Sequence, residues 1–400
     1  MKIFKSALMT AALAGTMLAT TPAFSQGTYQ FQVPVQGLDV EAELAFKKIS
    51  GGVAYFCGLT SASGVMCWGY NGNGQLGNGT NANSSLPVPV VGLESGVVDI
   101  EAGLAHVCAV TTAGEAKCWG ANSDGQLGNG TKDSSSLPVT VLGLGAGSGV
   151  TQISASRDRH TCATTSSGAA YCWGANYAGQ LGDNTLTTRT TPIQVTAAGV
   201  VAQITTGTSH SCAVTTSGSM RCWGRNDNGQ IGDGTKTMRK TPTLVQGLTS
   251  GVQMAEGGIN NTCAIVSGAA MCWGSGGAGE LGNGAKVDSA TPVMVSGLES
   301  GVTAISSSTN SCAIVSGSVK CWGLNQRGQL GNGTNVQSLV PVSVVGLPSN
   351  AVSLSTSPGF WTQCAVVKGG KAYCWGYNEA GQLGNGSTTD TWTPTLVTKE

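Results

Sequence analysis

The apolar positions of this chain fall in short segments separated by glycine-rich turns, and the same segments recur in the same order along the sequence. A Pro-Val-x-Val stretch, as at 138–141, precedes a Val-x-x-Ile stretch, as at 150–153. Two more segments follow in each unit and are joined by a tight turn, as at 106–111 and 115–120. Segments of this length and composition predict β-strands, and no stretch with helical periodicity accompanies them. The pattern therefore predicts an all-β fold.

One motif sets the period of the repeat, because Cys-Trp-Gly occurs seven times at intervals of 49 to 54 residues. Each copy runs on into Gly-Gln-Leu-Gly, except that the fourth copy has Ile231 and the fifth has Glu280. The tryptophans of the motif are Trp68, Trp119, Trp173, Trp223, Trp273, Trp322 and Trp375. Four strands and a glycine turn in about fifty residues are typical of a propeller blade. We therefore predict a seven-bladed β-propeller.

The Pro-Val-x-Val strand is placed first in each unit and at the outer edge of the blade, because proline cannot donate a ladder hydrogen bond. This stretch occurs eight times for seven hairpins, and the extra copy is at 33–36. A terminal strand commonly completes the last blade of a propeller. Either Val35 or Leu396-Val397 is therefore expected to fill that place, with the two chain ends near each other.

The fourteen cysteines are distributed two to a unit, one on each strand of the turn-linked pair. Pairs ten residues apart flank a three-residue loop such as 112–114, and pairs nine apart flank a two-residue loop such as 267–268. Both spacings place the two cysteines opposite each other, within reach of a disulfide. The rival interpretation is a zinc site, but the short Cys-x-x-Cys spacing of zinc ribbons is missing. The predicted disulfides are Cys57–Cys67, Cys108–Cys118, Cys162–Cys172, Cys212–Cys222, Cys263–Cys272, Cys312–Cys321 and Cys364–Cys374.

Residues 1–25 have the pattern of a cleaved signal peptide. Lys2 and Lys5 precede an apolar stretch at 7–18, and Ala23-Phe24-Ser25 gives a small-x-small cleavage site. No later stretch approaches the roughly 20 apolar residues that cross a bilayer. We predict a secreted or periplasmic protein without membrane insertion, whose residues 26–400 form a single propeller domain. An even number of cysteines is consistent with an oxidising compartment.

The charge pattern argues against nucleic acid as a ligand. Twenty basic residues balance twenty acidic ones, charged residues make up only 10% of the chain, and no basic run occurs. Binding to nucleic acid needs a cationic patch that replaces phosphate counterions. We therefore expect no nucleic-acid partner, and we expect a monomer.

Cys-Trp-Gly-x-Asn-x-x-Gly-Gln-Leu-Gly, preceded by His-x-Cys-Ala, resembles the repeat of the regulator-of-chromosome-condensation family over about residues 34 to 398. The resemblance implies a seven-bladed propeller closed into a ring. The family includes a chromatin-bound exchange factor, a plant ultraviolet photoreceptor and secreted bacterial inhibitors of β-lactamases. This chain is similar in compartment and architecture to the secreted bacterial branch. Because one fold hosts several functions, function has to be argued from sites.

Residues with catalytic potential are few. His106, His160 and His210 are the only histidines, and all three occupy one repeat position, two residues before a cysteine. Other units carry tyrosine, asparagine or threonine there, so the position favours a structural hydrogen bond over catalysis. No nucleophile elbow or phosphate loop is visible. We predict that the chain is not an enzyme and has no catalytic, cofactor-binding or metal-binding residues.

The loops before the His-x-Cys strands are expected on one face around the channel, by resemblance to the inhibitor branch. Blade seven touches blade one in a closed ring, so aromatic residues of their loops should form one patch, with charged residues of blade three on the same face. Aromatic anchors with arginine nearby are typical of an interface. The predicted partner-binding residues are Tyr55, Phe56, Arg157, Asp158, Arg159, Phe360 and Trp361.

These patterns favour an exported, non-enzymatic propeller that binds an extracytoplasmic protein as an interaction or inhibitor scaffold. Two alternatives remain open. One is a hydrolase or lyase with its site at the channel mouth, and the other is a structural or glycan-binding surface protein.

Overall fold

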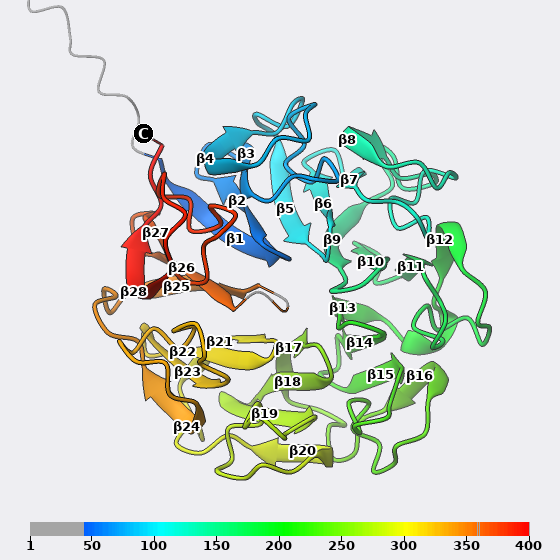
Figure 1. Ribbon diagram of the computed structural model, residues 1–400. Coiled ribbons are helices and arrows are strands. Elements are labelled where there is room, and N and C mark those ends of the chain that lie inside the picture. The colour runs from blue at the N-terminus through cyan, green and yellow to red at the C-terminus, as the bar shows by residue number, and fades with distance from the viewer. Residues whose placement is uncertain (1–43, 358, 360, 400) are drawn as a thin grey trace, which may run out of the picture. The chain divides into compact units, whose positions relative to one another are not determined.

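The computed structural model describes residues 44–357, 359 and 361–399, and these form seven four-stranded antiparallel sheets arranged in a ring (Figure 1). Consecutive blades contain β1–β4, β5–β8, β9–β12, β13–β16, β17–β20, β21–β24 and β25–β28. A single turn of 3₁₀ helix, Thr196–Ala198, is the only helix in the described part of the chain. The all-β, seven-bladed propeller predicted from the repeat is confirmed.

The first three blades have these strand bounds: β1 Phe46–Gly52, β2 Tyr55–Thr60, β3 Val65–Gly69, β4 Ser84–Pro89; β5 Val97–Ala102, β6 His106–Thr111, β7 Ala116–Gly120, β8 Ser135–Thr140; β9 Val150–Ala155, β10 His160–Thr165, β11 Ala170–Gly174, β12 Arg189–Gln194. The other four have these: β13 Val201–Thr206, β14 His210–Thr215, β15 Met220–Gly224, β16 Arg239–Leu244; β17 Val252–Gly257, β18 Asn261–Val266, β19 Ala269–Gly274, β20 Ser289–Met294; β21 Val302–Ser307, β22 Asn310–Val315, β23 Ser318–Gly323, β24 Ser338–Ser343; β25 Ala351–Thr356, β26 Thr362–Val367, β27 Ala372–Gly376, β28 Thr391–Leu396.

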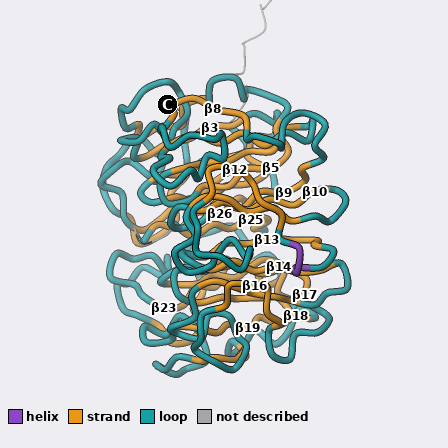
Figure 2. Tube along the Cα trace, turned by 90° about the vertical axis from the view of Figure 1, so that its right-hand side faces the viewer, coloured by secondary structure: helices purple, strands orange, loops and turns teal. Residues whose placement is uncertain are grey.

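The order of strands within a blade corrects one prediction. The proline-containing strand is the fourth of its blade, as β4 is in β1-β2-β3-β4, and not the first. A repeating pattern has no intrinsic starting point, so the sequence alone could not fix where a blade begins. The predicted edge position is confirmed, because β4 pairs with β3 and with no other strand of its sheet. The side view shows strands through the thickness of the ring and loops at its surface (Figure 2).

Each blade is joined to the next by the tryptophan of the Cys-Trp-Gly motif. Its indole Nε1 donates to the backbone carbonyl of the glutamine or glutamate in the preceding Gly-Gln-Leu-Gly turn, at 2.8 to 3.0 Å in all seven blades. All seven indoles are fully buried. The last glycine of the turn is needed for this contact, since Gly77 has a φ of +66° and a Cβ there would lie 2.7 Å from Trp119 Nε1. Glycine alone tolerates both conditions.

The seven predicted disulfides are all present, one in each blade. The paired cysteines stand directly opposite each other in the ladder, as Cys108 and Cys118 do, with Cα atoms 4.1 Å apart in that pair. Pairs nine residues apart keep the same register as pairs ten apart. Seven disulfides are typical of a protein of an oxidising compartment.

Ring closure uses the C-terminal strand. β28 is the fourth strand of blade seven and pairs with β27, so the C-terminal segment fills the place that two candidates competed for. The other candidate, at 33–36, lies outside the described residues. Blade seven meets blade one through Trp68, whose Nε1 donates to the Gln382 carbonyl at 3.0 Å. The predicted signal peptide also lies outside the described residues.

Deletion of residues 392–400 should lower the melting temperature by roughly 5 °C or more, because it removes most of β28 and the buried Val397. Differential scanning calorimetry of the disulfide-intact protein measures this change. An unchanged melt would assign closure of the ring to the N-terminal segment instead.

Candidate functional site

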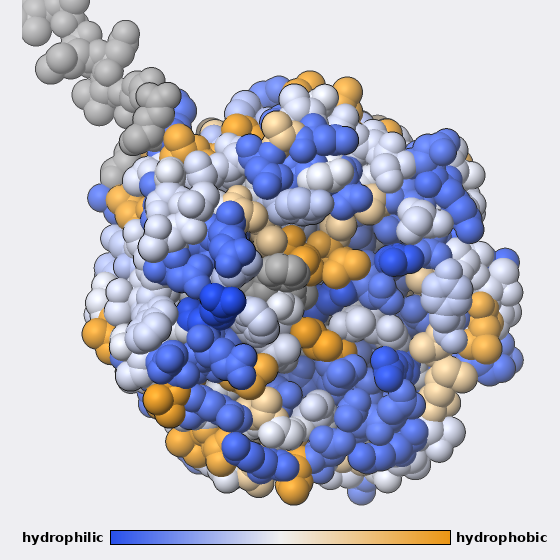
Figure 3. All heavy atoms as spheres, viewed as in Figure 1, coloured by the Kyte–Doolittle hydropathy of each residue, from blue (hydrophilic) through white to orange (hydrophobic). Residues whose placement is uncertain are grey.

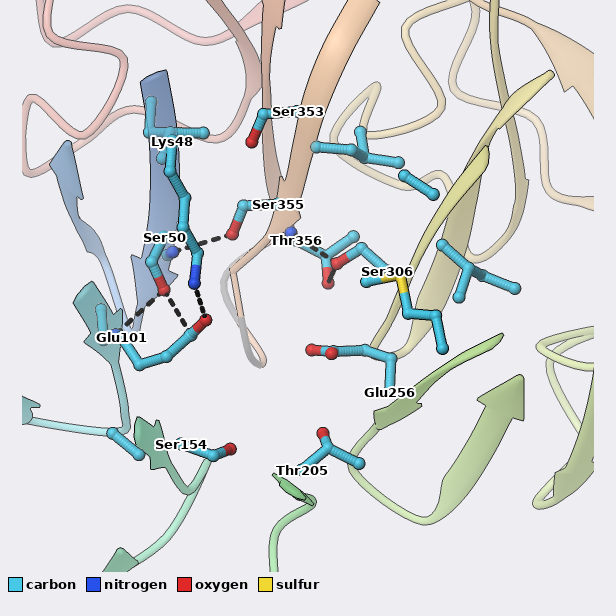
Figure 4. Close-up of a pocket in the computed structure, with 18 of the residues that line it drawn as sticks. Lys48, Ser50, Glu101, Ser154, Thr205, Glu256, Ser306, Ser353, Ser355 and Thr356 are labelled. Carbon is cyan, nitrogen blue, oxygen red and sulfur yellow. Dashed lines mark hydrogen bonds and ion pairs between the residues drawn. The ribbon is translucent and has the colours of Figure 1, made fainter. Parts of the chain in front are cut away.

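The first strand of every blade faces a central channel, and seven equivalent side chains form a ring within it. Each of them pairs across the ladder with the first cysteine of its own blade, which establishes the equivalence. The members of this channel ring are Ser50, Glu101, Ser154, Thr205, Glu256, Ser306 and Ser355. They line a cavity of about 350 Å³ (Figure 4). The space-filling view shows mixed hydrophilic and apolar residues around the centre of the ring (Figure 3).

The hydroxyl members of the channel ring act as latches between blades. Each accepts a hydrogen bond from a backbone N–H of the first strand of the next blade, at 2.9 to 3.1 Å. Ser50 accepts from the amide of Ala102, and Ser355 accepts from the amide of Gly51 across the closure of the ring. The hydroxyl therefore has a structural reason to recur at this position.

Glu101 and Glu256 replace the hydroxyl in blades two and five, and they project into the cavity from different sides (Figure 4). Glu101 is balanced by neighbours: Lys48 Nζ donates to its carboxylate at 2.6 Å and Ser50 Oγ donates at 2.8 Å. The same ammonium group donates to Asp99 at 2.8 Å. Burial alone would lower the pKa of Lys48, but the two carboxylates raise that pKa above its usual value.

Glu256 is less well balanced. Its nearest charged partner is Arg157, whose Nη2 lies 3.6 Å from the carboxylate, which is too far for a hydrogen bond. Burial raises the pKa of Glu256 to about 7, and Glu101 adds to this, while Arg157 and Lys48 act in the opposite direction. Arg157 itself is only 8% exposed, and burial lowers its pKa. Its Nη1 has no hydrogen-bond partner among the described residues.

The three histidines lie in the walls between blades. Nε2 of His106 is 3.0 Å from the Thr161 hydroxyl of the next blade, and His160 and His210 make the same kind of bond to Ser211 and Thr262. Burial lowers the pKa of each histidine to about 3. The predicted structural hydrogen-bonding role is confirmed. Within residues 44–357, 359 and 361–399, no three His, Cys, Asp or Glu side chains are grouped so that they could hold a metal ion.

Tyr55 and Phe56 do not belong to an exposed patch, so that part of the predicted partner-binding face was wrong. Both side chains are fully buried. The Tyr55 hydroxyl donates to the backbone carbonyls of Gly103 and His106, and the Phe56 ring stacks on Trp68 at 6.3 Å between centroids. Both residues lie on β2, inside the interface between sheets, rather than in the loop before it.

The charged residues predicted on the same face separate. Arg157 is buried and lines the cavity. Arg159 is exposed and its Nη1 donates to Asp124 at 3.0 Å, with Asp158 also beside it. Asp124 in turn accepts a short hydrogen bond from the Tyr177 hydroxyl. Phe360 lies outside the described residues.

Trp361 is partly exposed and forms the centre of a cluster between blades six and seven. Arg327 lies 5.9 Å from the Trp361 ring and 5.2 Å from the Tyr377 ring, and the two rings meet edge to face at 6.4 Å. Trp392 packs on the backbone of Gly328, the residue after Arg327. Trp361 also has a φ of +48°, which is rare for a bulky residue and costs free energy. We call Arg327, Trp361, Tyr377 and Trp392 the blade 6–7 cluster.

Three members of the blade 6–7 cluster escaped the sequence analysis. Each departs from its repeat position: Arg327 stands where other blades carry asparagine, aspartate or alanine, and Trp392 stands where most carry serine or threonine. Comparing the seven units position by position would have shown these departures. Their contact with Trp361 crosses a blade boundary, and that requires the folded ring.

Within the described residues, no helix is long and apolar enough to span a bilayer. A model of the RCC1-like domain matches residues 19–314, and a model of the regulator of chromosome condensation (RCC1) repeat matches residues 316–359 and 369–400.

Two curated relatives match part of the chain. Ultraviolet-B receptor UVR8 of Arabidopsis thaliana is 35% identical over 136 residues, which cover 34% of this chain and 30% of the receptor. Probable E3 ubiquitin-protein ligase HERC4 of Homo sapiens is 30% identical over 156 residues, which cover 38% of this chain and 15% of the ligase. The matches thus span less than a third of either relative.

Solved structures share the fold. Human WBSCR16 superposes with a TM-score of 0.73 and 22% identity, over 83% of this chain and 93% of that one. Prp20p of Saccharomyces cerevisiae superposes with a TM-score of 0.72 and 21% identity, over 89% of this chain and 87% of that one.

Glu256 gives the fold a specific pH dependence. Between its ordinary pKa of 4.5 and about 7, the folded protein keeps a proton on Glu256 that the unfolded chain has lost. The stability contributed by this group therefore falls as pH rises through that window. Glu256→Gln removes the titration, so the variant and the wild type should melt alike at about pH 5, and the variant should melt higher at about pH 8.

Thermal melts across this pH range measure the difference, with Glu299→Gln as the control at a solvent-exposed carboxylate. A difference between Glu256→Gln and the wild type that stays constant with pH would contradict the assignment.

Proposed function

This chain belongs to the RCC1-like family, and on that premise we propose that it is an exported, non-enzymatic propeller that binds a protein outside the cytoplasm. The interface that we propose is the blade 6–7 cluster, together with the neighbouring loops. The family supplies a binding scaffold, and the partner is set by the residues that depart from the repeat.

The observation that carries the proposal is the position of Arg327 between two aromatic rings, Trp361 and Tyr377. Tryptophan, tyrosine and arginine are the residue types that dominate binding energy at interfaces. Arg327 is 44% exposed at its side chain and Trp392 is 44% exposed, so the cluster presents surface to a partner. Because its rings are already packed on one another, little side-chain freedom is lost on binding.

Export is supported by two independent features. Residues 1–25 carry a signal-peptide pattern, and all fourteen cysteines are in disulfides that a reducing compartment would not maintain. Both features favour a partner in the periplasm or outside the cell.

A binding role is also supported by what the histidines do. All three are held between blades by hydrogen bonds and are kept neutral, so none of them is placed as an acid or base. Prp20p of Saccharomyces cerevisiae has binding properties to Gsp1p and histones, which is one protein-binding use of this fold. The partner of the present chain is proposed to be different, since its composition offers no basic patch for nucleic-acid-associated proteins.

Trp361→Ala and Arg327→Ala should each weaken partner binding by about 2 kcal/mol, roughly 30-fold in Kd, while the melting temperature stays close to that of the wild type. Affinity capture with the disulfide-intact protein from the native envelope and medium identifies the partner, and titration of the purified partner gives the Kd values. Tyr177→Ala is the matched control, because Tyr177 is a 65% exposed aromatic residue outside the cluster.

Undiminished binding by both cluster variants would refute this interface. An equal loss in Tyr177→Ala, or a large fall in the melting temperature of the cluster variants, would also refute it.

A further inference from the structure

Glu256 breaks the rule that the other blades follow at the channel ring. A hydroxyl at this position latches adjacent blades, and Ser306 in the following blade does so with the amide of Thr356 at 3.0 Å. Glu256 makes no hydrogen bond within the described residues, although it is buried enough to be only 28% exposed at its side chain. A buried carboxylate without hydrogen bonds is costly, and a serine here would stabilise the ring. The fold therefore gives no reason for this glutamate.

Arg157 provides a second, independent observation. Its guanidinium is fixed by two contacts: Nε donates to the Gly257 carbonyl at 3.1 Å and Nη2 donates to the Thr356 hydroxyl at 3.3 Å. Nη1 remains buried without an acceptor among the described residues, in the wall of the cavity that Glu256 also lines. A rigid, unsatisfied donor beside an unsatisfied acceptor indicates a ligand that both accepts from Arg157 and donates to Glu256.

The charges around the cavity decide the class of this ligand. Lys48 is shared by Asp99 and Glu101, and Arg157 is balanced by Glu256, so the lining has a net charge near −1. An anionic ligand would be repelled by the carboxylates. A cationic ligand would lie against the Arg157 guanidinium. A hydroxyl group donates and accepts at once without a net charge, so it satisfies both Glu256 and Arg157.

The shape and the remaining lining agree with such a ligand. The cavity of about 350 Å³ lies at the lower end of the range of small-molecule sites, which is roughly 300–1,000 Å³. Met254, Ala304 and Val352 supply apolar surface beside the hydroxyls of the channel ring. Polar groups on one side and apolar groups on the other suit a molecule with hydroxyl edges and C–H faces.

We propose that the channel binds a small, uncharged, polyhydroxylated ligand, a sugar or sugar alcohol, held between Glu256 and Arg157. This site is separate from the blade 6–7 cluster, and it does not depend on the identity of a protein partner.

Isothermal titration calorimetry tests the proposal with neutral probes: glucose, galactose, N-acetylglucosamine, maltose and sorbitol. Glucosamine, glucuronate and lysine serve as charged counterparts. Each is titrated to about 20 mM, which detects a Kd in the millimolar range. At least one neutral probe should bind the wild type with one site per chain, and at least about tenfold more tightly than any charged probe. Failure of every neutral probe, or tightest binding of a charged one, would overturn the proposal.

Glu256→Ser is the decisive variant, because it restores the hydroxyl that blades one, three, six and seven carry. It should melt at or above the wild-type temperature and bind the neutral probe at least about tenfold more weakly. Glu299→Ser, the same change at an exposed loop residue, should leave binding unaltered. Arg157→Lys should keep the charge but weaken binding, since it removes the planar fork.

A lower melting temperature for Glu256→Ser would show that Glu256 is structural and would overturn the proposal. Unaltered probe binding by this variant would overturn it as well. Loss of protein capture by the blade 6–7 variants would bear only on the separate interface, so the two proposals fail independently.

Discussion

The hydrogen bond from the motif tryptophan to the preceding Gly-Gln-Leu-Gly turn is the interaction on which the rest of the structure depends. It occurs once at every boundary between blades, including the closure between blades seven and one. The bond needs a tryptophan on one blade, a turn that presents its carbonyl on the previous blade, and a glycine where a Cβ would collide with the indole. These requirements explain why the repeat is so strict at three positions and so permissive elsewhere.

Burial follows the same boundaries. The core cluster around Trp119 combines Leu59 and Leu76 of blade one with Ile100 and Val107 of blade two, so the hydrophobic contacts lie between sheets rather than within one. A single blade therefore cannot bury its apolar face alone, and the blades stabilise one another as in other repeat proteins. The disulfides act differently, because each constrains a single hairpin. Cooperativity around the ring comes from the packing and the indole bonds.

A ring held together by repeated residues leaves function to the residues that differ. Residues that obey the repeat, such as the histidines and the hydroxyls of the channel ring, are occupied by bonds between blades. The departures gather in two places, the cavity around Glu256 and the blade 6–7 cluster around Trp361. Both sites rest on a rigid scaffold, so their side chains are positioned before any ligand arrives.

The sequence was sufficient for whatever depends on spacing. The number of blades, the edge position of the proline strand and the opposed cysteines all follow from period and turn length. Side-chain direction did not follow: Tyr55 and Phe56 adjoin a loop in the sequence, yet the strand begins at Tyr55 and both face the interior. Arg157 and Arg159 are two residues apart, yet one lines the cavity and the other faces solvent. Such choices depend on neighbours that only the closed ring brings together.

Hydrogen exchange at the nine indole N–H groups tests the central role of the tryptophan bond most directly, read by two-dimensional NMR of ¹⁵N-labelled protein. Seven indole signals should exchange only as fast as the whole protein unfolds, because their bonds join the blades. Those of Trp361 and Trp392 should exchange quickly at the surface. If any of the seven, above all Trp68 at the closure, exchanged as fast as these two in the folded protein, the account of a ring closed by this interaction would be contradicted.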